Sequence, residues 1–151
     1  MNKKTIKVVY DKEATRMSMP REGDIGIDLY ANVDDFIVYQ TANLIPTGIF
    51  IEMPPGYALM LKDRSSVSKY CHVLAGICDN RYRGQVFVRM YCHTIRDAQG
   101  MGSERGYTIT KGDKIAQALI VPDLTSQFEI VEVDELSETE RGSGGFGSTG
   151  K

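Results

Sequence analysis

The sequence predicts a single all-β domain of the β-sandwich or jelly-roll type. Short apolar runs of strand length recur along the chain, and turns rich in Gly and Pro separate them. A length of 151 residues is enough for one domain with a substantial core. From residue 135 the chain becomes polar and then Gly-rich. We therefore expect a β domain over residues 1–134 and a mobile tail over residues 135–151.

The apolar runs define the individual elements. Strands are predicted at residues 6–10, 36–39, 44–53, 57–61, 86–92, 107–110, 115–121 and 128–133. One short helical turn is predicted at residues 65–70, where Ser65 and Ser66 can cap the first N–H groups and no Gly or Pro interrupts the segment.

Composition and charge exclude several classes of protein. The chain has 18 Lys and Arg against 20 Asp and Glu, so no excess of positive charge favours nucleic-acid binding. No apolar run is long enough to cross a membrane, and the N-terminal residues do not form a signal peptide. The three cysteines lack the spacing of a metal site, so we expect reduced thiols in a cytoplasmic protein.

The stretch with the strongest chemical character covers residues 76–86. Its single carboxylate, Asp79, lies between two apolar segments, at a bend where a loop can present it to a cleft. An isolated Asp at a bend often only stabilises the turn. Here Tyr82 adds a flat face for a sugar or a base and Arg83 adds a positive charge, so a functional site is favoured.

Two other stretches are suited to anions. Arg64 and Ser65 stand at the start of the predicted helical turn, where hydroxyls, free N–H groups and a guanidinium can bind phosphate. A helix cap beside a surface arginine explains this segment equally well. The preceding Asp63 is unfavourable beside a phosphate unless its carboxylate points away. Gln117 places an amide inside an apolar strand and needs hydrogen-bond partners, of which a phosphate oxygen would be one.

The C-terminal residues 141–150 combine many glycines with an arginine and a phenylalanine. Gly-rich backbone can present several N–H groups to a phosphate, Arg141 can meet negative charge, and Phe146 can stack on a base. Flexible Gly/Ser tails without function are common, but such a tail has no use for Arg and Phe at fixed places.

Five stretches, in order along the chain, resemble the five motifs of the trimeric dUTP pyrophosphatase (dUTPase) family. They are residues 25–31, 63–68, 76–84, 111–117 and 141–150, and the last is the most specific. The family pattern is altered at Ile25, Asp63, Ser66, Cys78, Arg81 and Lys114. The segment between Arg64 and Asp79, where the family reads the uracil edge, is also shorter than usual.

The resemblance implies a jelly-roll homotrimer with active sites shared between subunits. The implied reaction converts dUTP and water into dUMP and pyrophosphate, with Mg²⁺ held by the triphosphate and water and no protein ligand. The resemblance makes Asp79 the catalytic base and gives Asp28 a supporting role near the metal-triphosphate. It assigns substrate contacts to Arg64, Ser65, Ser66, Gly76, Tyr82, Gln117, Arg141, Phe146, Gly147 and Ser148.

The sequence leaves two alternative functions open. A dCTP deaminase has a related fold but different chemistry, although the tail with Arg141 and Phe146 favours a dUTPase. A regulatory protein could use the same scaffold to bind a protein partner. The expected location is the cytoplasm, or the nucleus or host cytoplasm if the protein is viral.

Overall fold

The computed structural model describes residues 3–99, 104–140 and 142–143. These residues form eleven strands and one short 3₁₀ helix. The strands are β1 (Lys7–Tyr10), β2 (Ile27–Tyr30), β3 (Asp35–Val38), β4 (Ala42–Glu52), β5 (Tyr57–Lys62), β6 (Cys71–Leu74), β7 (Ile77–Cys78), β8 (Gln85–Cys92), β9 (Asp97–Gln99), β10 (Glu104–Ile109) and β11 (Lys114–Pro122), and the helix is η1 (Thr125–Gln127). Across these described ranges, no helix has the length and hydrophobicity needed to span a membrane.

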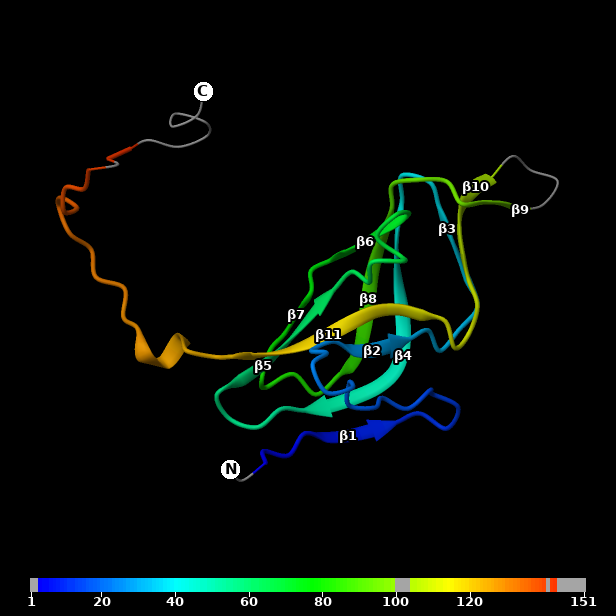
Figure 1. Cartoon of the computed structure of the whole chain (residues 1–151), viewed down its shortest axis with the longest axis horizontal. Helices are drawn as coiled ribbons and strands as arrows, with labels where there is room; N and C mark the ends of the chain where they lie inside the picture. The colour runs from blue at the N-terminus through cyan, green and yellow to red at the C-terminus, as the bar shows by residue number, and fades with distance from the viewer. Residues whose placement is uncertain (1–2, 100–103, 141, 144–151) are drawn as a thin grey trace.

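The strands form three antiparallel sheets, and the two larger ones enclose the core. Their strand orders are β1-β4-β8-β6 and β2-β11-β5-β7, and a smaller sheet has the order β3-β10-β9. Strands β4 and β11 are the longest members of the two larger sheets and cross near the centre of the molecule (Figure 1). The all-β sandwich or jelly-roll fold predicted from the sequence is confirmed.

Alternation of side chains fills the space between the sheets. Along β8 every second residue, from Val86 to Cys92, is buried, while the residues between them face outward. Ile45 and Ile49 from β4 and Leu59 from β5 complete this layer and are almost fully buried. Each such side chain contributes roughly 1.5–3 kcal/mol through removal from water. The buried residues of β5 and β11, among them Leu61 and Ile115, anchor these two strands, beside which candidate site residues lie.

Two predicted elements are wrong. Residues 65–70 form turns with only isolated α-type hydrogen bonds, such as Ser68 N–H to Arg64 O at 2.8 Å, because the chain enters β6 at Cys71 before a helix can develop. Residues 128–133 form no strand. The chain beyond η1 leads away from the sheets, so no neighbouring strand pairs with its backbone (Figure 1). Phe128 and Ile130 are consequently exposed.

Candidate functional site

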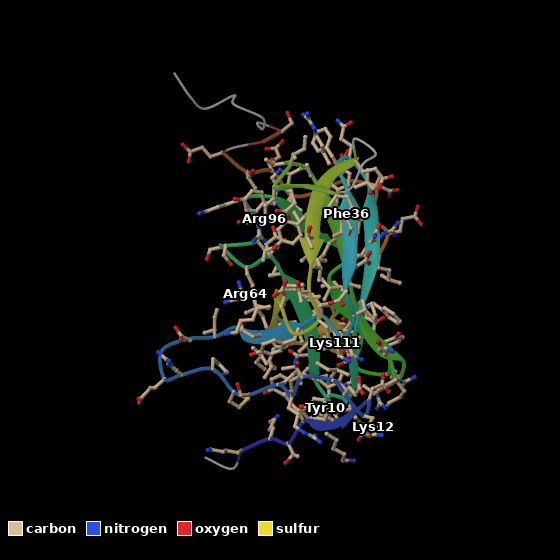
Figure 2. All side chains as sticks on the ribbon, turned by 90° about the vertical axis from the view of Figure 1, so that its right-hand side faces the viewer. Tyr10, Lys12, Phe36, Arg64, Arg96 and Lys111 are labelled. Atoms are coloured by element: carbon tan, nitrogen blue, oxygen red, sulfur yellow. The ribbon has the colours of Figure 1, made fainter. Side chains whose placement is uncertain are left out.

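A cleft of about 630 Å³ lies where β2, β11 and the turn after β5 meet. Its walls carry Asp28, Arg64, Ser65, Lys114 and Gln117, and the loop at residues 18–26 closes one side. The cleft therefore gathers predicted residues of the first, second and fourth motifs, although Ser66 of the second motif lies outside it. Arg64 is on the side of the molecule that also carries Arg96 (Figure 2).

Asp28 contacts two of the cationic side chains that line this cleft. Its Oδ1 lies 3.1 Å from Arg64 Nε, and its Oδ2 lies 2.7 Å from Lys114 Nζ. One carboxylate cannot neutralise two cations, so this group of three side chains keeps a net positive charge. The guanidinium and ammonium are thus already positioned for an anion such as phosphate. Lys114 was missed as a site residue, although its place in the fourth motif, where the family has Arg, signals this role.

Gln117 finds its hydrogen-bond partner within the protein. Its Nε2 donates to the backbone carbonyl of Asp63 at 2.8 Å, which ties β11 to the turn that carries Arg64. The side-chain oxygen lies against Gly26: a Cβ added there would be 2.2 Å from Oε1, so no larger residue fits without displacing the amide. The amide therefore has a structural role at the cleft wall, independent of any phosphate.

Asp63 directs its carboxylate to β6 and does not line the cleft. Oδ1 accepts from Val73 N–H at 2.6 Å and Oδ2 lies 2.9 Å from His72 Nδ1. Burial raises the pKa of Asp63, but the Val73 and His72 contacts outweigh it, so the pKa falls below the ordinary 3.8. Ionised Asp63 therefore stabilises the fold above the ordinary pKa, and this contribution is lost as the pH falls through the lower folded value.

Asp79 lies in a second cleft, of about 680 Å³, directly after β7. Pro55, Gly56 and Ala58 border the same space from the β4–β5 side. The Asp79 side chain is exposed, and no other side chain of the described ranges forms a hydrogen bond or ion pair with its carboxylate. Such a carboxylate is free to accept a proton from a water molecule in the cleft.

The loop that follows Asp79 is held in place by Asn80. The Asn80 amide donates to the carbonyls of Pro54 at 2.9 Å and Tyr57 at 3.0 Å. Arg83 Nη1 donates to Asn80 O at 2.7 Å, so this guanidinium also fastens the loop. These contacts fix the backbone that directly follows the carboxylate.

Tyr82 forms the outer part of this loop. Its hydroxyl donates to Gln85 O at 2.9 Å, and its ring lies over Gly84, where an added Cβ would come within 2.4 Å of the Tyr82 hydroxyl. The ring is 43% exposed. Tyr82 therefore keeps an accessible surface in a fixed orientation, as packing against a sugar requires.

Gly76 is required by the backbone itself. Its carbonyl accepts from Leu61 N–H at 2.6 Å, and a Cβ at this position would lie 2.3 Å from Leu61 O. Ala75, just before it, has a φ of 49°. This close approach lets the chain pass from β6 in one sheet to β7 in the other.

The two clefts lie towards opposite ends of β11. Gln117 lines the first and Pro122 the second, and the two share no lining residue. Five residues of strand separate them, a distance of about 17 Å. One chain therefore does not bring Asp79 to the cations of its own first cleft.

The remaining predicted residues are elsewhere. Ser66 is exposed and lines a neighbouring cleft with Lys69 and Arg96. Arg141, Phe146, Gly147 and Ser148 lie outside the described residues.

The fold and the first cleft together define an all-β protein with a cleft whose paired cationic side chains suit an anionic ligand. The dUTPase family model matches residues 12–150. The chain therefore belongs to the dUTPase family.

Curated and solved relatives agree with this assignment. The deoxyuridine 5'-triphosphate nucleotidohydrolase of Clostridium kluyveri is 39% identical over 145 residues, covering 93% of each chain. The structure of the dUTPase of Staphylococcus bacteriophage 80alpha with dUPNHPP superimposes with a TM-score of 0.83 at 28% identity, over 99% of this chain and 100% of the other. A point mutant of the dUTPase of phage phi11 of S. aureus, with a structural Mg(II) ion, shares the fold with a TM-score of 0.68 at 23% identity, over 91% of this chain and 99% of the other.

Proposed function

We propose that this chain is a dUTP pyrophosphatase that hydrolyses dUTP to dUMP and pyrophosphate as a homotrimer with active sites shared between subunits. The separation of Asp79 from the Arg64 cleft carries this proposal, because each cleft holds only part of the family's motif residues. A neighbouring subunit that brings its Asp79 to this cleft supplies the missing base.

In the proposed reaction the triphosphate occupies the first cleft. Arg64, Lys114 and the Ser65 hydroxyl bind its oxygens, and their fixed positions stabilise the charge that develops on the leaving pyrophosphate. Asp79 of a neighbouring subunit accepts a proton from the water that attacks the α-phosphorus. The described residues include no His, Asp, Glu or Cys cluster able to hold a metal by itself.

The donors in the first cleft fit a Mg²⁺ ion carried by the triphosphate. Both oxygens of Asp28 contact cations, so this carboxylate is suited to reach the ion through water. When bound, the ion would shield the negative charge of the triphosphate.

The exposed segment after η1 supports assembly into an oligomer. Ile130, Val131 and Leu136 are exposed by 103%, 63% and 87%, although nearby residues of this segment are acidic. Apolar residues of this size are stabilised by burial. We propose that the segment pairs with a neighbouring subunit, where the strand predicted at residues 128–133 would form.

The three free cysteines support a reducing compartment. Cys71 and Cys92 are buried without a disulfide, and Cys78 is partly buried. Disulfides are rare in the cytoplasm, and we place the activity there.

A turnover assay tests the proposed function directly. The purified protein is given dUTP, dTTP, dCTP and UTP with Mg²⁺, and both pyrophosphate and ammonia are measured. We expect pyrophosphate from dUTP without ammonia, and a particle of three subunits by light scattering. Ammonia release from dCTP would instead identify a deaminase.

Tyr82→Ala is expected to raise the rate on UTP relative to dUTP. Without the ring, a 2′-hydroxyl no longer meets a packed surface. Tyr82→Phe is the matched control, because it keeps the ring and loses only the hydroxyl contact with Gln85 O. Steady-state kinetics on both nucleotides measure the ratio. If the ratio is the same in wild type and Tyr82→Ala, sugar discrimination lies elsewhere.

We expect the short crossover between β6 and β7 to discriminate uracil from other bases less strictly than the longer segment of typical dUTPases does. Only Ala75 and Gly76 separate the two strands, and the Gly76 carbonyl is already bonded to Leu61 N–H. Fewer backbone groups are thus left to pair with uracil. We predict measurable hydrolysis of dCTP or dTTP in the same assay, and strict selectivity for dUTP would contradict this expectation.

A further inference from the structure

The only two histidines of the chain are stacked on each other, next to the turn whose residues Arg64 and Ser65 line the first cleft. The ring centroids of His72 and His93 are 4.2 Å apart with an angle of 18° between the planes. His72 comes from β6, and His93 directly follows β8. Cys71 and Cys92 are direct partners in this antiparallel pair, so the next residue on each strand projects from the opposite, outer face, where the two rings meet.

Each histidine holds one end of the turn that carries Arg64 and Ser65. His72 Nδ1 lies 2.9 Å from Asp63 Oδ2, immediately before Arg64. His93 Nε2 lies 3.0 Å from Ser68 O, after the turn, and Ser68 N–H in turn donates to Arg64 O. The stacked pair therefore joins the two ends of the segment at residues 63–68, in which Arg64 and Ser65 line the first cleft.

The hydrogen-bond partners fix the proton positions in the neutral rings. Ser68 O is an acceptor, so His93 carries its proton on Nε2 and accepts at Nδ1 from the Thr94 hydroxyl, 2.9 Å away. Ionised Asp63 also accepts only, so His72 carries a proton on Nδ1. His72 can then gain a second proton on Nε2 while it keeps the contact with Asp63.

We propose that His72 and His93 are positioning residues that hold the Arg64 turn ready for phosphate. This inference rests on the proposed function of the Arg64 cleft. The contacts of the two rings with Asp63 and with Ser68 O, together with their stacking at 4.2 Å, fix the two ends of the turn relative to each other.

Two double variants test the positioning role. His72→Asn/His93→Gln keeps an amide donor near each original donor nitrogen. His72→Ala/His93→Ala removes both contacts. With dUTP and Mg²⁺ at pH 7.5, we expect the alanine pair to lower kcat/KM about 10-fold, mainly through KM, because the anion-binding side chains are misplaced. The amide pair should remain close to wild type.

The rise of KM without a matching fall of kcat, and its rescue by the amide pair, are the readouts that a purely structural role would not produce. An alanine pair with wild-type KM, or an amide pair with the KM of the alanine pair, would overturn the proposal.

A binding experiment without turnover covers the case of an inactive or unfolded variant. Inorganic triphosphate is added to the wild-type protein while NMR follows the imidazole signals. We expect both histidine signals to shift on binding. Unmoved histidine signals at saturating triphosphate would refute the positioning role of the pair. Absence of pyrophosphate release from dUTP by the wild type would refute the proposed function alone.

Discussion

Asp79→Asn is expected to lower kcat for dUTP hydrolysis by about 100-fold or more, with nucleotide affinity changed only a few-fold. The amide has nearly the same shape as the carboxylate but cannot accept the proton of the attacking water. The fold should not change, because within the described ranges no hydrogen bond or ion pair depends on the Asp79 carboxylate. The loop stays fixed by Asn80 through the carbonyls of Pro54 and Tyr57.

Asp123→Asn provides the matched control for this experiment. Asp123 lines the same cleft, but its carboxylate accepts from Thr125 N–H at the start of η1. This variant should keep most of the turnover, which would show that the loss in Asp79→Asn does not follow from a reduced charge in the cleft. Single-turnover rates and binding of a non-hydrolysable analogue separate chemistry from affinity. Wild-type turnover in Asp79→Asn would end the assignment of the base.

Deletion of residues 141–151 is expected to abolish nearly all turnover while the protein still folds and assembles. This segment contains the Gly-rich motif with Arg141 and Phe146. Fixing its backbone on a nucleotide costs about 1–2 kcal/mol per residue, and contacts of the N–H groups, the guanidinium and the ring must offset that cost. The gain lies in closing the site around the triphosphate and excluding water other than the nucleophile.

Single substitutions and a longer deletion locate the effect. Arg141→Ala and Phe146→Ala should each cause part of the loss. Removal of residues 128–151 should also reduce assembly, because it takes away the exposed apolar residues around Ile130. Kinetics, thermal melting and light scattering compare the variants. Full activity of the shorter deletion would contradict the role of the motif in closure, and a large fall in its melting temperature would make the segment structural.

The β fold was predictable where alternation and turns were clear, and less so at its edges. The run at residues 86–92 corresponds closely to β8, because its alternating apolar residues face the core. Strand β7 has only two residues, Ile77 and Cys78, and no sequence pattern specifies a strand so short. Residues 128–133 have strand-forming side chains, but a strand also needs a partner, and the described part of this chain provides none for them.

The sequence predicted residues that share one cleft, but not their arrangement. Asp28, Arg64 and Gln117 were predicted from separate motifs, and the structure brings them to one cleft. Their contacts depend on the pairing of β2 with β11 and on the turn after β5, which are long-range features of the fold. The role of Asp63 could not be predicted for the same reason, since its partners Val73 and His72 become neighbours only when β6 forms.

The placement of the two clefts towards opposite ends of β11 has a genetic consequence. In the proposed trimer, a subunit that lacks Asp79 still offers an intact first cleft, and a subunit that lacks Arg64 still offers its base. Two inactive alleles, one that damages the first cleft and one that damages the second, can therefore restore some complete sites when they are expressed together. Two alleles that both damage the same cleft cannot. In the proposed trimer, defects in the two clefts thus fall into two complementation groups, defined by the end of β11 at which they lie.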